Sequence, residues 1–148
     1  MDLYFDTSYL FRLYSFESGH DIVKELLADC DTVVSAAHAR AEFAAVILRK
    51  RREKTDSAAH LTELHEQFLD EYRDGYIAFL PLSEAVFERL ESTLRNASRD
   101  TFIRASDALH LACAAEHGFE KVYSNDRHFL ATAPLFGLRG LNVIPHTS

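Results

Sequence analysis

Short apolar runs alternate with longer helical segments along the chain. Four runs rich in β-branched and aromatic residues predict strands at residues 3–5 (LYF), 31–36 (DTVVSA), 76–80 (YIAFL) and 121–124 (KVYS). A further run at residues 141–144 (LNVI) predicts a fifth strand at the edge of the sheet, before Pro145.

The segments between these runs have helical character. Helices are expected at residues 9–14, 21–28, 38–53, 57–74, 83–97 and 106–117. Ser83 is a suitable N-cap, while Gly75 and Gly118 end two of the helices. Strands that alternate with helices predict an α/β fold of three layers (α/β/α), with a central parallel sheet of four to five strands flanked by helices.

The length of 148 residues predicts a single domain spanning residues 1–148, and no Gly-, Ser- or Pro-rich stretch indicates a linker. The N-terminus has no cationic region of a secretory signal, and no apolar stretch is long enough to span a membrane. Cys30 and Cys113 lie far apart in the sequence. A reduced, cytoplasmic protein is therefore expected.

The formal net charge of −7 argues against broad, non-specific adhesion to nucleic acid, which requires clustered cations. It leaves room for an enzyme that acts on nucleic acid, because bound metal ions reverse the sign of an acidic site. One basic run is present at residues 49–52 (RKRR) and is followed by Lys54. This run either contacts phosphates or is the solvated C-terminal end of a helix.

In open α/β sheets, functional residues lie directly after strands. Asp6 follows the first predicted strand, and Asp126 follows the fourth after one intervening residue. Glu42 and Asp107 lie on helices whose neighbouring positions are mostly small or apolar, where a carboxylate is costly without a compensating cation or donor. Singly, each acid has a structural explanation as a helix cap, a first-turn acid or a solvated residue.

Together, four acids in one crevice favour a site for a hard divalent cation such as Mg²⁺ or Mn²⁺, which prefers oxygen ligands. Such a cation activates water and polarises phosphate, so the fitting reaction is hydrolysis of a phosphodiester. A receiver-like phosphoacceptor domain would need paired acids after the first strand and a late lysine, which this chain lacks. A dehalogenase-type phosphatase would need an acid at position 8, which is serine.

Four segments resemble the four motifs of PIN domains and, more narrowly, of VapC toxins from toxin–antitoxin pairs: LYFDTSYLFRLY, ARAEFAAV, RASDALHLACA and VYSNDRHF. The resemblance implies an endoribonuclease whose Mg²⁺ or Mn²⁺ is held chiefly by Asp6 and Asp107, with Glu42 and Asp126 completing the acidic site. It also implies that Ser8 and Ser124 steady these ligands. RNA is the implied substrate, with a cognate antitoxin and a second copy of the chain as partners.

Other residues near the motifs are weaker candidates. Arg12, Arg104 and Arg127 are expected to meet the phosphate backbone, with Arg40 and Arg99 also near the acidic motifs in sequence. His110 lies one turn after Asp107 and is interpreted as a structural residue, since a hard cation prefers oxygen. Two alternatives stay open: an inactive PIN-like scaffold for protein contacts, and a housekeeping RNA-processing nuclease that has no antitoxin.

Overall fold

The computed structural model describes residues 1–145, in which parallel strands alternate with helices. The strands are β1 (Leu3–Tyr4), β2 (Val33–Ala36), β3 (Ile77–Leu80), β4 (Lys121–Tyr123) and β5 (Arg139–Leu141). The α-helices are α1 (Thr7–Arg12), α2 (His20–Glu25), α3 (Ala39–Glu53), α4 (Ala58–Arg73), α5 (Glu84–Arg95), α6 (Ala105–Glu116) and α7 (Arg127–Thr132). Two 3₁₀ turns, η1 (Leu26–Asp29) and η2 (Ala133–Phe136), follow α2 and α7.

The strand order places β1 at the centre of the structure. β1, β2 and β3 form one parallel ladder in that order, and β4 pairs with β5 in a second parallel ladder. A bridge between Phe5 and Tyr123 joins the two, and the Asp6 amide donates to the Tyr123 carbonyl at 3.1 Å. The strand order therefore reverses at β1, which is where a site is expected in an open α/β sheet.

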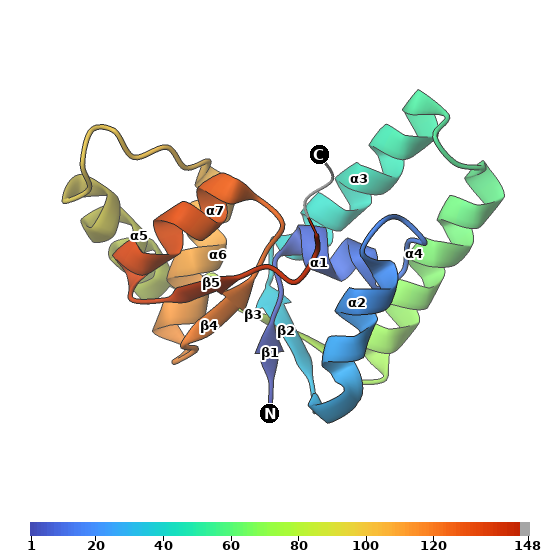
Figure 1. The fold of residues 1–148 in the computed structure, drawn as a ribbon, viewed down its shortest axis with the longest axis horizontal. Coiled ribbons are helices and arrows are strands. Elements are labelled where there is room, and N and C mark those ends of the chain that lie inside the picture. The colour runs from blue at the N-terminus through green and yellow to red at the C-terminus, as the bar shows by residue number, and fades with distance from the viewer. Residues whose placement is uncertain (146–148) are drawn as a thin grey trace.

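Helices cover both faces of the strands, and each face has its own hydrophobic core (Figure 1). Helices α1 to α4 lie on one side, where Phe5 and Val33 enter the core. Helices α5 to α7 lie on the other, where Tyr4 and Val34 are buried. Successive strand residues thus point to opposite cores, as the period of two requires, and the predicted α/β/α fold is confirmed.

The predicted fifth strand was misplaced. Strand β5 occupies Arg139–Leu141 instead of residues 141–144. Gly140 permits this position because an added Cβ there would lie 2.9 Å from Leu130 Cδ2 of α7. After Leu141 the chain turns toward α1, where the Val143 amide donates to the Tyr9 hydroxyl at 2.7 Å. The apolar run beyond Leu141 thus supplies core residues and not a strand.

Helix α7 was also missed, since no helix was predicted after residue 117. It has six residues, too few to show a helical period in sequence. The other helices lie within a few residues of their predicted positions, and Ser83 caps α5 by accepting from the Val86 amide. Within residues 1–145, no helix is long and apolar enough to cross a membrane.

Candidate active site

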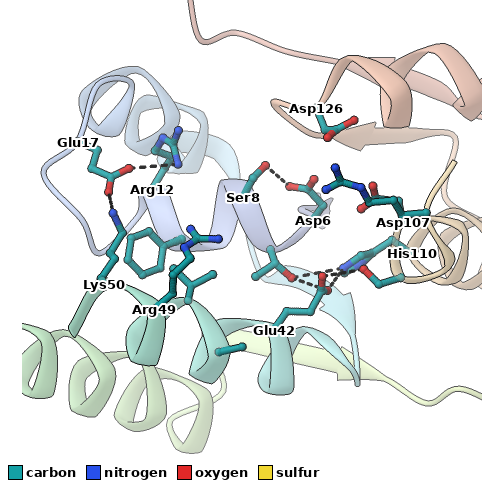
Figure 2. Close-up of a pocket in the computed structure, with 16 residues that line it drawn as sticks. Asp6, Ser8, Arg12, Glu17, Glu42, Arg49, Lys50, Asp107, His110 and Asp126 are labelled. Carbon is teal, nitrogen blue, oxygen red and sulfur yellow. Dashed lines mark hydrogen bonds and ion pairs between the residues drawn. The ribbon is translucent and has the colours of Figure 1, made fainter. Parts of the chain in front are cut away.

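The four predicted acids line one open pocket of about 500 Å³ (Figure 2). Asp6 directly follows the sheet residue Phe5, and Asp126 follows β4. Glu42 lies in the first turn of α3, after β2, and Asp107 lies in the first turn of α6. The structure therefore brings together acids that are separated by up to 120 residues, as the sequence predicted.

Asp6 is both the N-cap of α1 and a buried acid of the pocket. Its Oδ1 accepts from the Tyr9 amide at 3.0 Å and from Ser8 Oγ at 2.6 Å, and its Oδ2 accepts from Ser124 Oγ. Burial raises the pKa of Asp6, while the charge of His110 and the bonds from Ser124 and Ser8 act in the opposite direction. The Asp6 side chain therefore both caps α1 and forms part of the pocket.

The two predicted supporting serines connect the first motif to the last. Ser124 donates to Asp6 and accepts from the Asp126 amide at 3.0 Å. Ser8 donates to the other Asp6 oxygen and accepts from the Asn125 amide at 3.2 Å. The loop after β4 is thus held on the Asp6 carboxylate through two hydroxyl groups.

Asp126 uses one carboxylate oxygen to cap α7. Its Oδ1 accepts from the amides of His128 at 2.8 Å and Phe129 at 3.0 Å. Among residues 1–145, the second oxygen has no hydrogen-bond partner, and Figure 2 shows the carboxylate facing the side of the pocket that holds Asp6 and Asp107.

Asp107 is the least satisfied of the four acids. Its side chain is half-buried, and within the described part of the chain it makes no hydrogen bond and no ion pair. Arg104, three residues before Asp107, forms no ion pair with it in this part of the chain. Burial, with the negative charges of Asp6 and Asp126, raises the pKa of Asp107 to about 6. The pocket thus contains a carboxylate without an ion-pair partner among the described residues.

Glu42, by contrast, is fully engaged by protein donors. Its Oε1 accepts from Thr7 Oγ1 and from His110 Nε2, each at 2.8 Å, and its Oε2 accepts from Ser106 Oγ at 2.8 Å. Burial alone would raise the pKa of Glu42, but the bonds from these donors and the charge of His110 outweigh it and lower the pKa to about 2.

His110 is buried and anchors this network. Its Nε2 donates to Glu42, because an ionised carboxylate only accepts, and its Nδ1 lies 2.7 Å from the Tyr4 hydroxyl. The interpretation of His110 as a structural residue agrees with these contacts. Sequence reasoning missed Tyr4, Thr7 and Ser106 as partners, because no local pattern links residues 35 to 106 positions apart.

Two groups of side chains could hold a metal ion. In the first, ligand atoms of His38, Glu42 and His110 lie within 4.8 Å of one another. However, His110 Nε2 already bonds Glu42, and His38 Nε2 lies 2.8 Å from the Ser106 carbonyl oxygen, to which it donates. A ring nitrogen that donates carries a hydrogen and has no free lone pair, so neither Nε2 atom is available to bind an ion in this arrangement.

The second group consists of Asp6, Asp107 and Asp126. It offers oxygen atoms alone, of which those of Asp107 and one of Asp126 have no protein partner within residues 1–145. Such a donor set fits a hard cation such as Mg²⁺ or Mn²⁺. By the chemistry of their donors, the aspartates thus fit the expected metal better than the cluster around Glu42, which is the group within residues 1–145 whose ligand atoms already lie within 4.8 Å of one another.

Comparison with known protein families matches residues 3–134 to the PIN domain. The chain belongs to the PIN domain family. This match covers most of the sequence, including all four acids, and the comparison with curated proteins gives no match.

Solved structures similar to this PIN domain are VapC toxins and related toxin–antitoxin complexes. VapC20 of Mycobacterium tuberculosis, described as a sarcin-ricin loop cleaving toxin, is 17% identical with a TM-score of 0.65, over 88% of this chain and 94% of its own. VapBC2 of Rickettsia felis, bound to a promoter DNA fragment, is 13% identical with a TM-score of 0.67, over 96% and 98%. FitAB bound to a DNA fragment is 17% identical with a TM-score of 0.64, over 100% of both chains.

The cations of this PIN domain are unevenly distributed around the pocket. Of the predicted phosphate contacts, Arg12 and Arg104 line it, whereas Arg127 is exposed and is not among its lining residues. Arg49 and Lys50, which the sequence left undecided between phosphate contact and a solvated helix end, also line the pocket. The other two arginines near the motifs, Arg40 and Arg99, are exposed outside it.

Proposed function

We propose that this PIN domain is a metal-dependent endoribonuclease whose active site is the pocket formed by Asp6, Glu42, Asp107 and Asp126. The observation that carries the proposal is the Asp107 carboxylate, which is half-buried in the same pocket as two other aspartates and has no ion-pair partner within residues 1–145. A carboxylate in that position is stabilised when a cation joins it.

Some residues of the pocket would bind the metal ion, and others hold these ligands in position. Asp6, Asp107 and Asp126 would hold Mg²⁺ or Mn²⁺, and Ser8 and Ser124 fix the two oxygens of Asp6. When bound, the cation supplies Lewis-acid polarisation of a phosphate oxygen and lowers the pKa of a coordinated water.

Glu42 and the cations complete the proposed site in different ways. Through Ser106, Glu42 ties α3 to the residue that precedes Asp107, so its role is to position α6. Arg104 and Arg12 line the pocket and would contact the phosphate backbone of RNA. Arg127, exposed outside the pocket, is expected to contribute less.

The cellular role that we propose is that of a VapC-like toxin, inhibited by a cognate antitoxin and acting as a homodimer. The support is the likeness in fold to VapC20 and to the VapBC and FitAB complexes, together with a complete set of four acids. The test is expression without a partner: growth should stop, and Asp107→Ala should restore it. Growth that continues with the unaltered chain would count against the toxin role.

The nuclease activity has a direct test. Purified protein is incubated with total RNA and Mg²⁺, then with EDTA, and the same is done with Asp6→Asn. Cleavage should require both the metal and the carboxylate. Asp100→Asn, a matched change at an exposed position outside the pocket, should cut as the unaltered protein does. Cleavage that survives EDTA, or is indifferent to Asp6→Asn, would overturn the proposed mechanism.

A further inference from the structure

The end of the pocket opposite the aspartates is basic and contains one bridging carboxylate. Glu17 pairs with Lys50 through Oε1 and with Arg12 through Oε2, the latter at 3.5 Å from the guanidinium Nη1. Figure 2 shows Glu17 between these two cations, well apart from Asp6 and Asp107. Here Glu17, Arg12 and Lys50 are called the Glu17 bridge.

The two cations of the Glu17 bridge are held in place by other contacts as well. The Arg12 Nε donates to the Ser18 carbonyl at 3.1 Å, and the Lys50 ammonium lies 5.3 Å from the centre of the Phe11 ring. Their side chains are only 20% and 18% exposed. Both cations are therefore preorganised within the pocket, which reduces the entropy lost when an anion binds.

Glu17 is the replaceable member of the bridge. It lies in the irregular segment between α1 and α2, and its side chain is 35% exposed, more than either cation. Its carboxylate binds both cations through separate oxygens, in the way that a phosphate group would. A backbone phosphate of RNA, which also carries one negative charge on two free oxygens, could take its place without moving either helix.

Arg49 adds a cation that the bridge does not neutralise. It lines the same pocket from α3, next to Lys50, and forms no ion pair within the described residues. Three cations therefore share this end of the pocket with the single carboxylate of Glu17. On a chain with a net charge of −7, this is a local excess of positive charge, connected through one pocket to the acidic cluster.

We propose that the Glu17 bridge is a second phosphate site, in which a backbone phosphate of the RNA displaces Glu17 and binds between Arg12 and Lys50. Arg49 contacts the same strand on its way to the aspartates. This inference rests on the proposed nuclease function. In it, Glu17 competes with the RNA phosphate for Arg12 and Lys50. An RNA that contacts only the aspartate end of the pocket leaves Glu17 paired with Arg12 and Lys50, and it therefore binds weakly.

The test measures binding separately from cleavage. A fluorescein-labelled, mixed-sequence 12-nucleotide RNA is titrated with the full chain carrying Asp107→Asn in Mg²⁺, and anisotropy is followed from 50 to 200 mM salt. Into this background are placed Glu17→Gln, Arg49→Gln, Lys50→Gln and the control Arg52→Gln, which removes the same charge from an exposed position of α3 outside the pocket.

Glu17→Gln should tighten binding by roughly threefold at 50 mM salt, because it removes the competing charge. Arg49→Gln and Lys50→Gln should weaken binding and each reduce the salt dependence by about 0.7 in the slope of log K against log salt. Arg52→Gln should change neither the affinity nor the slope of log K against log salt. Thermal melting confirms that each variant is folded.

The inference is overturned if Glu17→Gln binds RNA more weakly than the Asp107→Asn background or equally well. It is also overturned if Arg52→Gln weakens binding as much as Arg49→Gln does, or if the Asp107→Asn background does not bind the RNA. These results leave the proposed function standing if the unaltered protein still cuts RNA in Mg²⁺. Conversely, the variants could change binding as expected while the unaltered protein shows no metal-dependent cleavage. That result would support the phosphate site and overturn the proposed nuclease function.

Discussion

Two carboxylates of the pocket, Glu42 and Asp107, lie in opposite environments. Glu42 accepts hydrogen bonds on both oxygens, and its pKa is lowered to about 2. Asp107 has no such donor within residues 1–145, and its pKa is raised to about 6 by burial and by its acidic neighbours. The hydrogen bonds of Glu42 are complete in the protein alone, whereas Asp107 has no ion-pair partner within residues 1–145.

This difference separates two roles that sequence motifs do not distinguish. A carboxylate whose lone pairs are satisfied by the protein contributes to stability and position. A carboxylate that is repelled by its neighbours stores unfavourable energy, which a bound cation relieves. We therefore expect substitutions of Glu42 to act first on folding and substitutions of Asp107 to act first on activity.

The largest expected effect is the loss of cleavage in Asp107→Asn. Removing a metal ligand should cost several kcal/mol of transition-state stabilisation, which corresponds to a rate lower by about 100-fold or more. In EDTA, its melting temperature should equal or exceed that of the unaltered protein, because a repelled charge is removed. Cleavage of labelled RNA and thermal melting measure the two effects. An Asp107→Asn variant with a lower melting temperature and normal cleavage would show that Asp107 acts on stability and not on activity.

Next in size is the loss of stability in Glu42→Ala. The substitution leaves Thr7, Ser106 and His110 without their shared acceptor, and should lower the free energy of unfolding by about 2–3 kcal/mol. Urea denaturation of this variant and of Asp107→Ala, both in EDTA, gives the comparison. Equal losses in the two variants would show that the environments do not differ in the way described.

The dependence of stability on pH should have opposite signs for the two acids. Between its ordinary pKa of 3.8 and about 6, Asp107 keeps its proton in the folded state but loses it in the unfolded state, so stability falls as pH rises. Between about 2 and its ordinary pKa of 4.5, Glu42 is ionised only in the folded state, so stability is lost as pH falls.

Each contribution should amount to about 1 kcal/mol, after allowance for screening of these half-exposed groups. Urea denaturation from pH 3 to pH 7 in EDTA measures them. Asp107→Asn should reduce the fall above pH 4, to which Asp6 also contributes because burial raises its pKa. Glu42→Gln should abolish the loss below pH 4.5, and Mg²⁺ should suppress only the fall above pH 4. A fall of unchanged size in Asp107→Asn would contradict the pKa shift of Asp107.

The smallest expected effect belongs to Ser106→Ala, which removes one hydrogen bond to Glu42. It should lower the free energy of unfolding by about 1 kcal/mol. Because Ser106 adjoins Asp107, it should also reduce cleavage, by less than about tenfold. Ser98→Ala, at an exposed position before α6, is the matched control, since its hydroxyl meets only the Asp100 amide. No change in Ser106→Ala on either measure would show that Glu42 holds α6 without it.

Much of the fold and the location of the acids could be predicted because both follow from local patterns. Asp6 and Asp126 follow apolar strand runs, and the strand-end rule places them in one crevice. The edge strand could not be located in the same way. Val143 and Ile144 are apolar because they pack into the core that contains α1, whereas Arg139 and Gly140 pair with β4 without a strand-like composition.

The differing environments of the acids could not be predicted, because their partners are distant in sequence. Glu42 receives bonds from Thr7, Ser106 and His110, which lie 35 to 68 residues away. Conversely, Arg104 lies three residues from Asp107 and forms no ion pair with it in the described structure. The partner of Glu42 that is close in sequence, His38, lies farther away, at 3.5 Å. Proximity in sequence thus identifies neither the three donors that Glu42 bonds at 2.8 Å nor the lack of an ion pair at Asp107.

The single bridge between Phe5 and Tyr123 determines when the pocket can form during synthesis of the chain. Ser124, which holds one oxygen of the Asp6 carboxylate, is synthesised 118 residues after Asp6. A nascent chain that lacks β4 therefore has no complete acidic pocket. For an enzyme proposed to cut RNA, this order of assembly means that the growing chain should stay inactive until β4 and the loop after it have been made.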